Sequence, residues 1–182
     1  METEQPPKKP PQPGTHDIAQ DVDPVKMELY LQEVRDRQNY SLALLAAIVA
    51  AAAGAAAWAA MTVWSEKEYA LLAIGIGFLV GFSVRLAGRG IDKPFGVIGA
   101  LFAFLGVVAG KIGTMVVLLS QKLDISIGQA LRILNADIVM NFLKETFSVI
   151  DILFYIAAIF VGYKYAFKPI PAEDLLKLQK NA

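Results

Sequence analysis

A glycine-rich pair of apolar segments between residues 73 and 113 constrains this chain more than any other feature of its sequence. The stretch reads AIGIGFLVGFSVRLAGRGIDKPFGVIGALFAFLGVVAGKIG and holds ten of the fourteen glycines. A turn with three cations, Arg85, Arg89 and Lys93, separates the two segments. Glycine at this density within long apolar runs is typical of membrane helices whose backbones lie in close contact. The stretch therefore predicts a membrane-embedded pair of closely packed helices.

Composition supports a membrane protein. Of the 182 residues, 55% are hydrophobic, whereas a soluble domain has roughly 45–50% even when glycine is counted. The apolar residues are gathered in blocks, as membrane spans require. Seventeen basic and seventeen acidic residues cancel, so no overall field attracts nucleic acid, and we expect no nucleic-acid partner. The chain has no cysteine, which excludes disulfides and thiolate chemistry.

Four apolar runs are long enough for a membrane span, which needs about 20 residues. They cover residues 40–64, 69–88, 94–119 and 147–165. The sequence therefore predicts an all-α membrane protein in which a four-transmembrane-helix bundle occupies residues 39–168.

The segments that flank the bundle are predicted to be cytoplasmic. Residues 1–22 are rich in proline and form a disordered tail, because such a composition cannot bury a core. Residues 23–38 form a short amphipathic helix with Asp23 as its N-cap, and one face carries Met27, Tyr30, Leu31 and Val34. Residues 169–182 form a second tail that contains a short amphipathic helix.

The segment before the fourth span is too polar to cross the membrane, but its apolar residues follow a helical spacing. Residues 120–146 are therefore predicted to form one or two short amphipathic helices on the outer side, with Ser126 and Asp137 as caps.

Basic residues indicate the orientation of the bundle. The side with the termini and the turn between the second and third spans has ten: Lys26, Arg35, Arg37, Arg85, Arg89, Lys93, Lys164, Lys168, Lys177 and Lys180. The opposite side has four: Lys67, Lys122, Arg132 and Lys144. The positive-inside rule then predicts that both termini are cytoplasmic.

Small residues recur at regular intervals in the predicted third span. Gly96, Gly99, Ala103, Gly106, Gly110 and Gly113 are separated by three and four residues in alternation, which places them along one helix face. Gly77 and Gly81 form a GxxxG pair in the second span. These positions are predicted to pack closely against another helix.

Two charged residues, Lys111 and Asp151, lie inside predicted spans. At about 1.5 Å per residue, Lys111 lies roughly 26 Å from the start of its helix, and Asp151 lies about 6 Å from the start of its own. Because the two helices run in opposite directions, both levels fall in the outer part of the membrane. Our hypothesis is an ion pair between adjacent helices, since a lone charge costs about 2.5–3.5 kcal/mol there. The alternative is that each side chain reaches the outer interface separately.

The cations of the turn, Arg85, Arg89 and Lys93, have two interpretations. They could bind an anionic lipid head group or an acidic partner, or they could serve only as anchors that set the topology. Both interpretations place them at the cytoplasmic membrane surface.

Two strings, GIGFLVGFSVRLAGRGIDKPFGVIGALFAFLGVVAGK and FSVIDILFYIAAIFVGYKYAFK, resemble segments of small, uncharacterised, multi-pass bacterial inner-membrane proteins. The resemblance covers roughly the membrane half of the chain and leaves out the proline-rich tail. It implies a location in a bacterial plasma membrane, and it implies no particular activity.

The sequence favours a non-enzymatic protein. No paired carboxylate, histidine or cysteine lies within the spans, and the catalytic and nucleotide-binding motifs HExxH, GxSxG and the P-loop are missing, so we expect no cofactor and no metal site. We expect a structural, accessory or assembly subunit that packs against itself or a larger membrane complex and contacts membrane lipids. The alternative is a small transporter or channel-forming oligomer that uses Lys111 and Asp151.

Overall fold

The computed structural model describes residues 22–65, 70–146 and 148–178. Within these ranges every regular element is a helix. The predicted tail at residues 1–21 and the chain end at 179–182 lie outside the described residues. The chain divides into two compact units, of which one is Arg35–Lys168 and the other combines Met1–Val34 with Pro169–Ala182.

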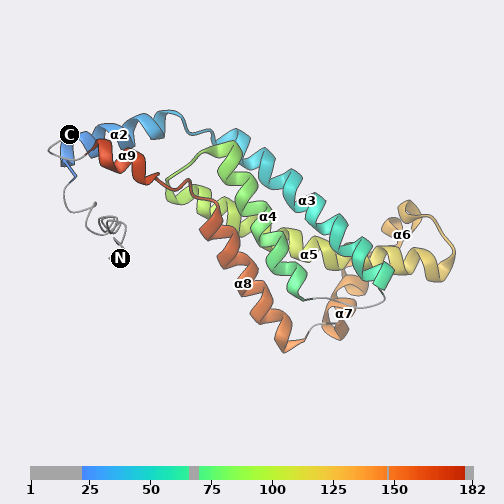
Figure 1. The fold of residues 1–182 in the computed structure, drawn as a ribbon. Coiled ribbons are helices and arrows are strands. Elements are labelled where there is room, and N and C mark those ends of the chain that lie inside the picture. Colours follow the sequence, from blue (N-terminus) through green and yellow to red (C-terminus); the bar gives the residue numbers. More distant parts are fainter. Residues whose placement is uncertain (1–21, 66–69, 147, 179–182) are drawn as a thin grey trace, which may run out of the picture. The chain divides into compact units, whose positions relative to one another are not determined.

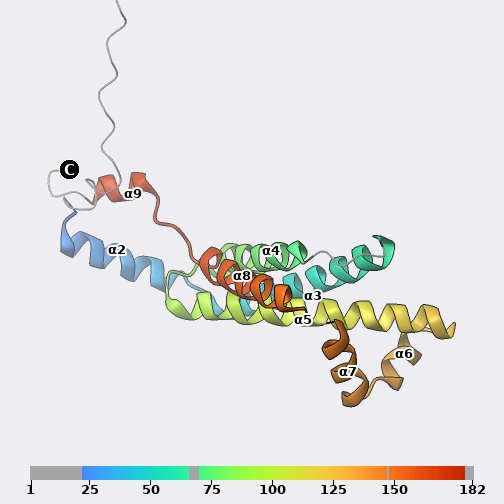
Figure 2. The same cartoon turned by 90° about the horizontal axis from the view of Figure 1, so that it is seen from below.

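Four long helices form the larger unit: α3 (Tyr40–Ser65), α4 (Leu71–Gly88), α5 (Lys93–Leu123) and α8 (Val149–Tyr165). They lie side by side, and consecutive members run in opposite directions (Figures 1 and 2). Helices α4 and α5 contact each other, and both contact α3 and α8. The two outer helices, α3 and α8, therefore lie on opposite sides of a central α4–α5 pair.

The four helices differ in length. At 1.5 Å per residue, α3 with 26 residues is about 39 Å long and α5 with 31 residues is about 46 Å long. By the same measure α4 with 18 residues and α8 with 17 residues are about 27 and 25 Å long. Helices α3, α4 and α5 are long and apolar enough to cross a membrane. Helix α8 and the helix before it, which meet at an angle of 105°, give a fourth candidate crossing only if the two are counted as one span.

Local sequence explains where α4 and α5 end. Arg89 follows α4 with a positive φ of 51° and donates its backbone N–H to the Arg85 carbonyl. Helix α5 begins at Lys93, with Pro94 in its first turn, where proline is tolerated. It continues to Leu123, four residues beyond the predicted span, and ends at Asp124, which also has a positive φ. These extra residues place the C-terminal turn of α5 outside the central bundle.

Two short helices, α6 (Ile127–Ile133) and α7 (Ala136–Thr146), connect α5 to α8. Ser126 caps α6 in a capping box with Gln129, as predicted. The prediction that Asp137 caps α7 is wrong, because the Asn135 side chain accepts the Ile138 N–H at 2.8 Å and α7 already includes Asp137. Helix α6 packs against α5, whereas α7 has no buried side chain among those described.

The core of the bundle is built mainly from alanine, valine and glycine, with one large ring at each end. Phe95 is fully buried at the α4–α5 turn and stacks on Tyr40, with ring centroids 4.5 Å apart. Trp58 is buried toward the other end of α3. Small side chains between the rings allow the helix axes to approach closely.

The smaller unit contains most of α2 (Pro24–Asp36) and α9 (Ala172–Lys177). Asp23 caps α2 by accepting the Val25 N–H at 2.9 Å. The Tyr30 hydroxyl donates to Asp174 on α9 at 3.0 Å, and the Asp23 N–H donates to the Leu178 carbonyl at 2.9 Å. These bonds join the beginning of the described chain to its end.

Candidate functional site

The structure brings Lys111 and Asp151 together. Lys111 lies on α5 and Asp151 on α8, and the Nζ–Oδ2 distance is 2.8 Å. The Lys111 side chain is 1% exposed and the Asp151 side chain is 12% exposed. A pair this deeply buried needs further hydrogen bonds to offset the loss of water from both charges.

Asp151 receives such a hydrogen bond from its own helix. It is the third residue of α8, and its Oδ2 also accepts the backbone N–H of Ser148 at 3.1 Å. Ser148 in turn caps the helix with its hydroxyl, which completes a capping box. The first turn of a helix favours a negative charge. Asp151 therefore caps α8 and binds α8 to α5 with a single carboxylate.

Other buried polar groups lie near this level of the bundle. Thr114, one turn beyond Gly110, donates its hydroxyl to the Gly110 carbonyl at 3.0 Å. On α3, Trp58 packs against Gly110, and Thr62 lies one turn further along the helix. The Trp58 Nε1 and the Thr62 Oγ1 are buried and have no hydrogen-bond partner in the described structure. The core is thus more polar toward the C-terminal end of α3 than toward the α4–α5 turn.

In the transporter hypothesis, Lys111 and Asp151 line an outer vestibule. Their side chains are instead covered, and neither residue lines the two cavities described below. The transporter function remains a prediction.

Glycines bring α4, α5 and α8 into backbone contact around Gly162. An added methyl group at Gly99 would overlap the Gly162 carbonyl oxygen, and one at Gly81 would lie 2.7 Å from the same atom. One at Gly77 would overlap the Ala158 carbonyl oxygen. Sequence reasoning missed Gly162, although Ala158 and Gly162 form a small-xxx-small pair that could have revealed it.

The regularly spaced small residues of α5, from Gly96 to Gly113, pack against three neighbouring helices, whereas a single partner was expected. Gly96 and Gly99 face α8, as does Ala103, which lies 2.8 Å from a methyl group built at Gly162. Gly110 and Gly113 face α3, where they meet Trp58 and Ala59, and Gly106 meets both Ile76 of α4 and Ala51 of α3. A 3.5-residue spacing drifts around a straight helix of 3.6 residues per turn, which turns successive positions toward a new neighbour.

The cationic turn between α4 and α5 is a junction at one end of the bundle. The Asn39 N–H donates to the Gly88 carbonyl at 3.0 Å, and the Lys168 N–H donates to the Gly90 carbonyl at 2.9 Å. Arg35 pairs with Asp92 at 3.2 Å. The chain therefore enters and leaves the bundle at one turn.

The three predicted site cations of this turn lie around that junction. Arg89 and Lys93 are exposed and Arg85 is partly exposed. Arg89 adopts its left-handed conformation without being glycine, at a cost of about 1–2 kcal/mol. Whether the three residues bind lipid or only set topology remains a prediction.

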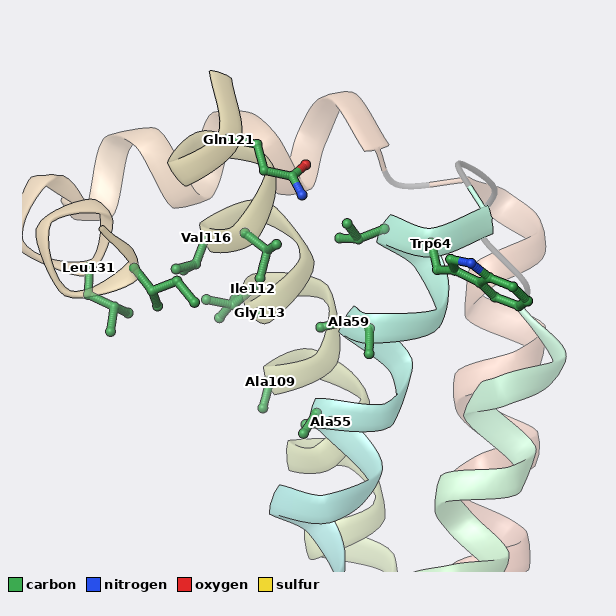
Figure 3. A pocket seen from close by; sticks show the side chains of 14 residues that line it. Ala55, Ala59, Trp64, Ala109, Ile112, Gly113, Val116, Gln121 and Leu131 are labelled. Carbon is green, nitrogen blue, oxygen red and sulfur yellow. The ribbon is translucent and has the colours of Figure 1, made fainter. Parts of the chain in front are cut away.

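A long apolar groove lies between the C-terminal halves of α3 and α5 (Figure 3). Its volume is about 1020 Å³, comparable to known small-molecule sites of about 300–1,000 Å³. Small residues of α3 and α5 form its floor, and α6 contributes a side wall through Ile127 and Leu131. The polar side chain at its end is Gln121, and Figure 3 shows its amide near the last turn of α3. Sequence reasoning did not find this groove, because it depends on where α6 folds.

A second cavity of about 560 Å³ lies among α5, α7 and α8 and is lined by Phe104, Val108, Leu143, Lys144 and Tyr155. Among the described residues, no three histidine or carboxylate side chains gather in a way that could hold a metal ion. The single histidine, His16, lies outside the described residues.

Comparison of the chain with protein-family models, with curated proteins and with solved structures finds no match.

Proposed function

We propose that this chain is a non-enzymatic integral membrane protein that acts as a structural, accessory or assembly subunit. Its charged core pair is satisfied within the bundle, and most of its glycines are used in contacts between its own helices. The groups that would carry chemistry in an enzyme are thus engaged in holding the fold. A surface for packing against another membrane helix is the feature that remains.

Four spans with both termini in the cytoplasm of a bacterium form part of the proposal. Asn39 and Lys168 hydrogen-bond to the same α4–α5 turn, which supports an even number of crossings. The cations at this turn support a cytoplasmic location for it. The resemblance to bacterial inner-membrane proteins supports the plasma membrane as the site of insertion.

The exposed alanine face of α3 is the observation that carries the accessory role. Beyond its contacts with α4 and α5, α3 exposes Ala52, Ala53, Ala56, Ala57 and Ala60. Small residues on an exposed transmembrane face allow another helix to approach closely. Ala53 and Ala57 are separated by one turn and do not line the groove. We propose that these two residues contact a helix of a second copy or of a larger complex.

Cysteine cross-linking tests this contact directly, because the chain has no native cysteine. Ala53→Cys and Ala57→Cys should cross-link in native membranes to a second copy or to a co-purifying subunit. Ile152→Cys on the exposed face of α8 is the matched control and should cross-link much less. Affinity purification in mild detergent would then identify the partner.

The companion variant Ala53→Leu/Ala57→Leu should weaken the same association, since larger side chains hold the helices apart. Equal cross-linking from α3 and α8, together with a monomeric mass in detergent and no co-purifying subunit, would contradict the accessory role.

A further inference from the structure

The α3–α5–α6 groove spans the outer part of the bundle and then ends. At its inner end lie Ala55 and Ala109. Further inward the two helices close together, because Ala51 lies 3.3 Å from a methyl group built at Gly106. From Ala109 to Gln121 is twelve residues of α5, or about 18 Å. This length is close to one leaflet of a bilayer that is roughly 40–45 Å thick with its head-group regions included.

The polarity of the groove changes along the membrane normal. The residues of α3 and α5 that line it are apolar up to Val117, and Gln121 provides a polar side chain at the outer end. Gln121 lies 26 residues after Phe95, the buried ring at the inner end of the bundle, or about 39 Å along α5. A hydrocarbon slab of roughly 30 Å that starts at Phe95 would therefore leave Gln121 at the level of the outer head groups.

These dimensions match an amphiphile that stands upright in one leaflet. We propose that the α3–α5–α6 groove binds an acyl chain of a phospholipid from the leaflet opposite the Arg89 turn, with the head group beside Gln121. The apolar walls exclude water from the chain, and the Gln121 amide can hydrogen-bond to ester or phosphate oxygens.

A lipid fits the groove better than a helix does. The groove closes where Ala51 meets Gly106, so a helix that crosses the roughly 30 Å of hydrocarbon would lie in it over only part of its length. A helix is also about 10 Å wide, and Ile127 and Leu131 of α6 stand on one side of the groove. A single flexible chain can follow a space bounded in this way.

The tryptophans of the chain provide an optical test. Trp64 lines the groove and is 84% exposed, whereas the only other tryptophan, Trp58, is buried. In detergent, titration of the full chain with a brominated-chain phosphatidylglycerol should quench Trp64 fluorescence in a saturable way. Trp64→Phe should remove most of that quenching. Native mass spectrometry of the same samples should show one retained lipid.

Two variants of matched chemistry decide the outcome. Ala56→Leu/Ala60→Leu fills the groove and should abolish saturable quenching and the retained lipid. Ala53→Leu/Ala57→Leu adds the same bulk to an exposed face outside the groove and should leave both intact. Circular dichroism before titration verifies that both variants fold.

Equal lipid retention by the two double variants would overturn the proposal. A changed oligomeric mass in Ala56→Leu/Ala60→Leu, with lipid retention unchanged, would instead assign the groove to a second copy. The accessory role is tested by the opposite variant, since Ala53→Leu/Ala57→Leu should weaken subunit association while it keeps the lipid. The two proposals can therefore fail independently.

Discussion

Two glycines of α4 that lie two residues apart should respond in opposite ways to the same substitution. A methyl group at Gly75 meets no atom within 4 Å, whereas one at Gly77 would overlap the Ala158 carbonyl of α8. Gly75→Ala should therefore raise the free energy of unfolding by up to about 1 kcal/mol through helix propensity. Gly77→Ala should lower it by about 1–3 kcal/mol because the backbones must move apart.

Thermal unfolding of the two variants in detergent, followed by circular dichroism, measures this difference. A Gly77→Ala protein as stable as Gly75→Ala would mean that α4 and α8 are not in backbone contact.

Substitutions of Lys111 and Asp151 should lower the free energy of unfolding by unequal amounts. Asp151→Asn keeps an oxygen that can accept the Ser148 N–H, but it removes the negative charge that faces Lys111. Lys111 is the more buried residue of the pair. Lys111→Met leaves a carboxylate that still caps α8 and is slightly exposed. Breaking a buried pair costs about 3–5 kcal/mol, and we expect Asp151→Asn to be the more destabilising change.

The double variant Lys111→Met/Asp151→Asn should be more stable than Asp151→Asn alone, because no uncompensated charge remains. Thermal unfolding of all three variants forms a double-mutant cycle. Strictly additive losses would show that the two side chains contribute independently.

At the level of single residues, the sequence predicted which small residues pack closely against another helix and which charged residues lie inside the bundle. It did not predict most of the residues that they contact. The depth of Lys111 and Asp151 along their helices could be estimated from the rise per residue alone. The contact of Gly99 with Gly162 could not, because it requires the relative rotation of α5 and α8. Rotation is set by all side chains along the helix pair together.

Among the elements, helix positions were predictable and helix ends were less so. Long apolar runs predicted α3, α4 and α5 to within a few residues. The C-terminal end of α5 was placed too early, because hydropathy falls at Ser120 while the helix continues to Leu123. Competing caps were harder still, since Asn135 and Asp137 both suit the start of α7. Only the backbone geometry of the connection selects Asn135.

The contact between α2 and α9 should depend on pH. Burial of Tyr30 raises the pKa of its hydroxyl above the ordinary value near 10, and the hydrogen bond to Asp174 and the nearby carboxylates raise it further. A raised folded-state pKa means that this contact contributes fully below about pH 10. Its contribution is lost as the pH rises through the raised value.

Ultraviolet titration of tyrosinate in the full chain, with Tyr30→Phe as the reference, isolates the Tyr30 transition. Asp174→Asn should move the Tyr30 pKa toward its ordinary value while the other tyrosines titrate as before. An unchanged Tyr30 transition in Asp174→Asn would contradict the α2–α9 hydrogen bond.

On the scale of the whole molecule, the proposed topology makes a simple labelling prediction. Lys93 and Lys122 are exposed and lie near opposite ends of α5. In intact bacterial cells whose outer membrane has been permeabilised, a membrane-impermeant maleimide should label Lys122→Cys and spare Lys93→Cys. Disrupting the inner membrane should make both reactive. Labelling of Lys93→Cys alone in intact cells would show that the orientation is reversed.

The arrangement of the whole molecule was the part least accessible from the sequence. Antiparallel order follows from short connections, but the central position of α4 and α5 does not. The groove likewise needs α6 to fold back beside α5, and a stretch such as Ile127–Ile133 carries no signal for that direction. Long-range packing determines these features, and no local pattern encodes it.

The unequal lengths of the four helices bear on the membrane around the protein. Helices α4 and α8 are about 25–27 Å long, which is less than the roughly 30 Å of hydrocarbon, whereas α3 and α5 are about 39–46 Å long and continue beyond it. In the proposed topology, the bilayer relieves this hydrophobic mismatch by local thinning beside α4 and α8. Neighbouring proteins with short spans would reduce that deformation by gathering on the thin side. The bundle could thus select its surroundings through membrane elasticity, without any specific contact.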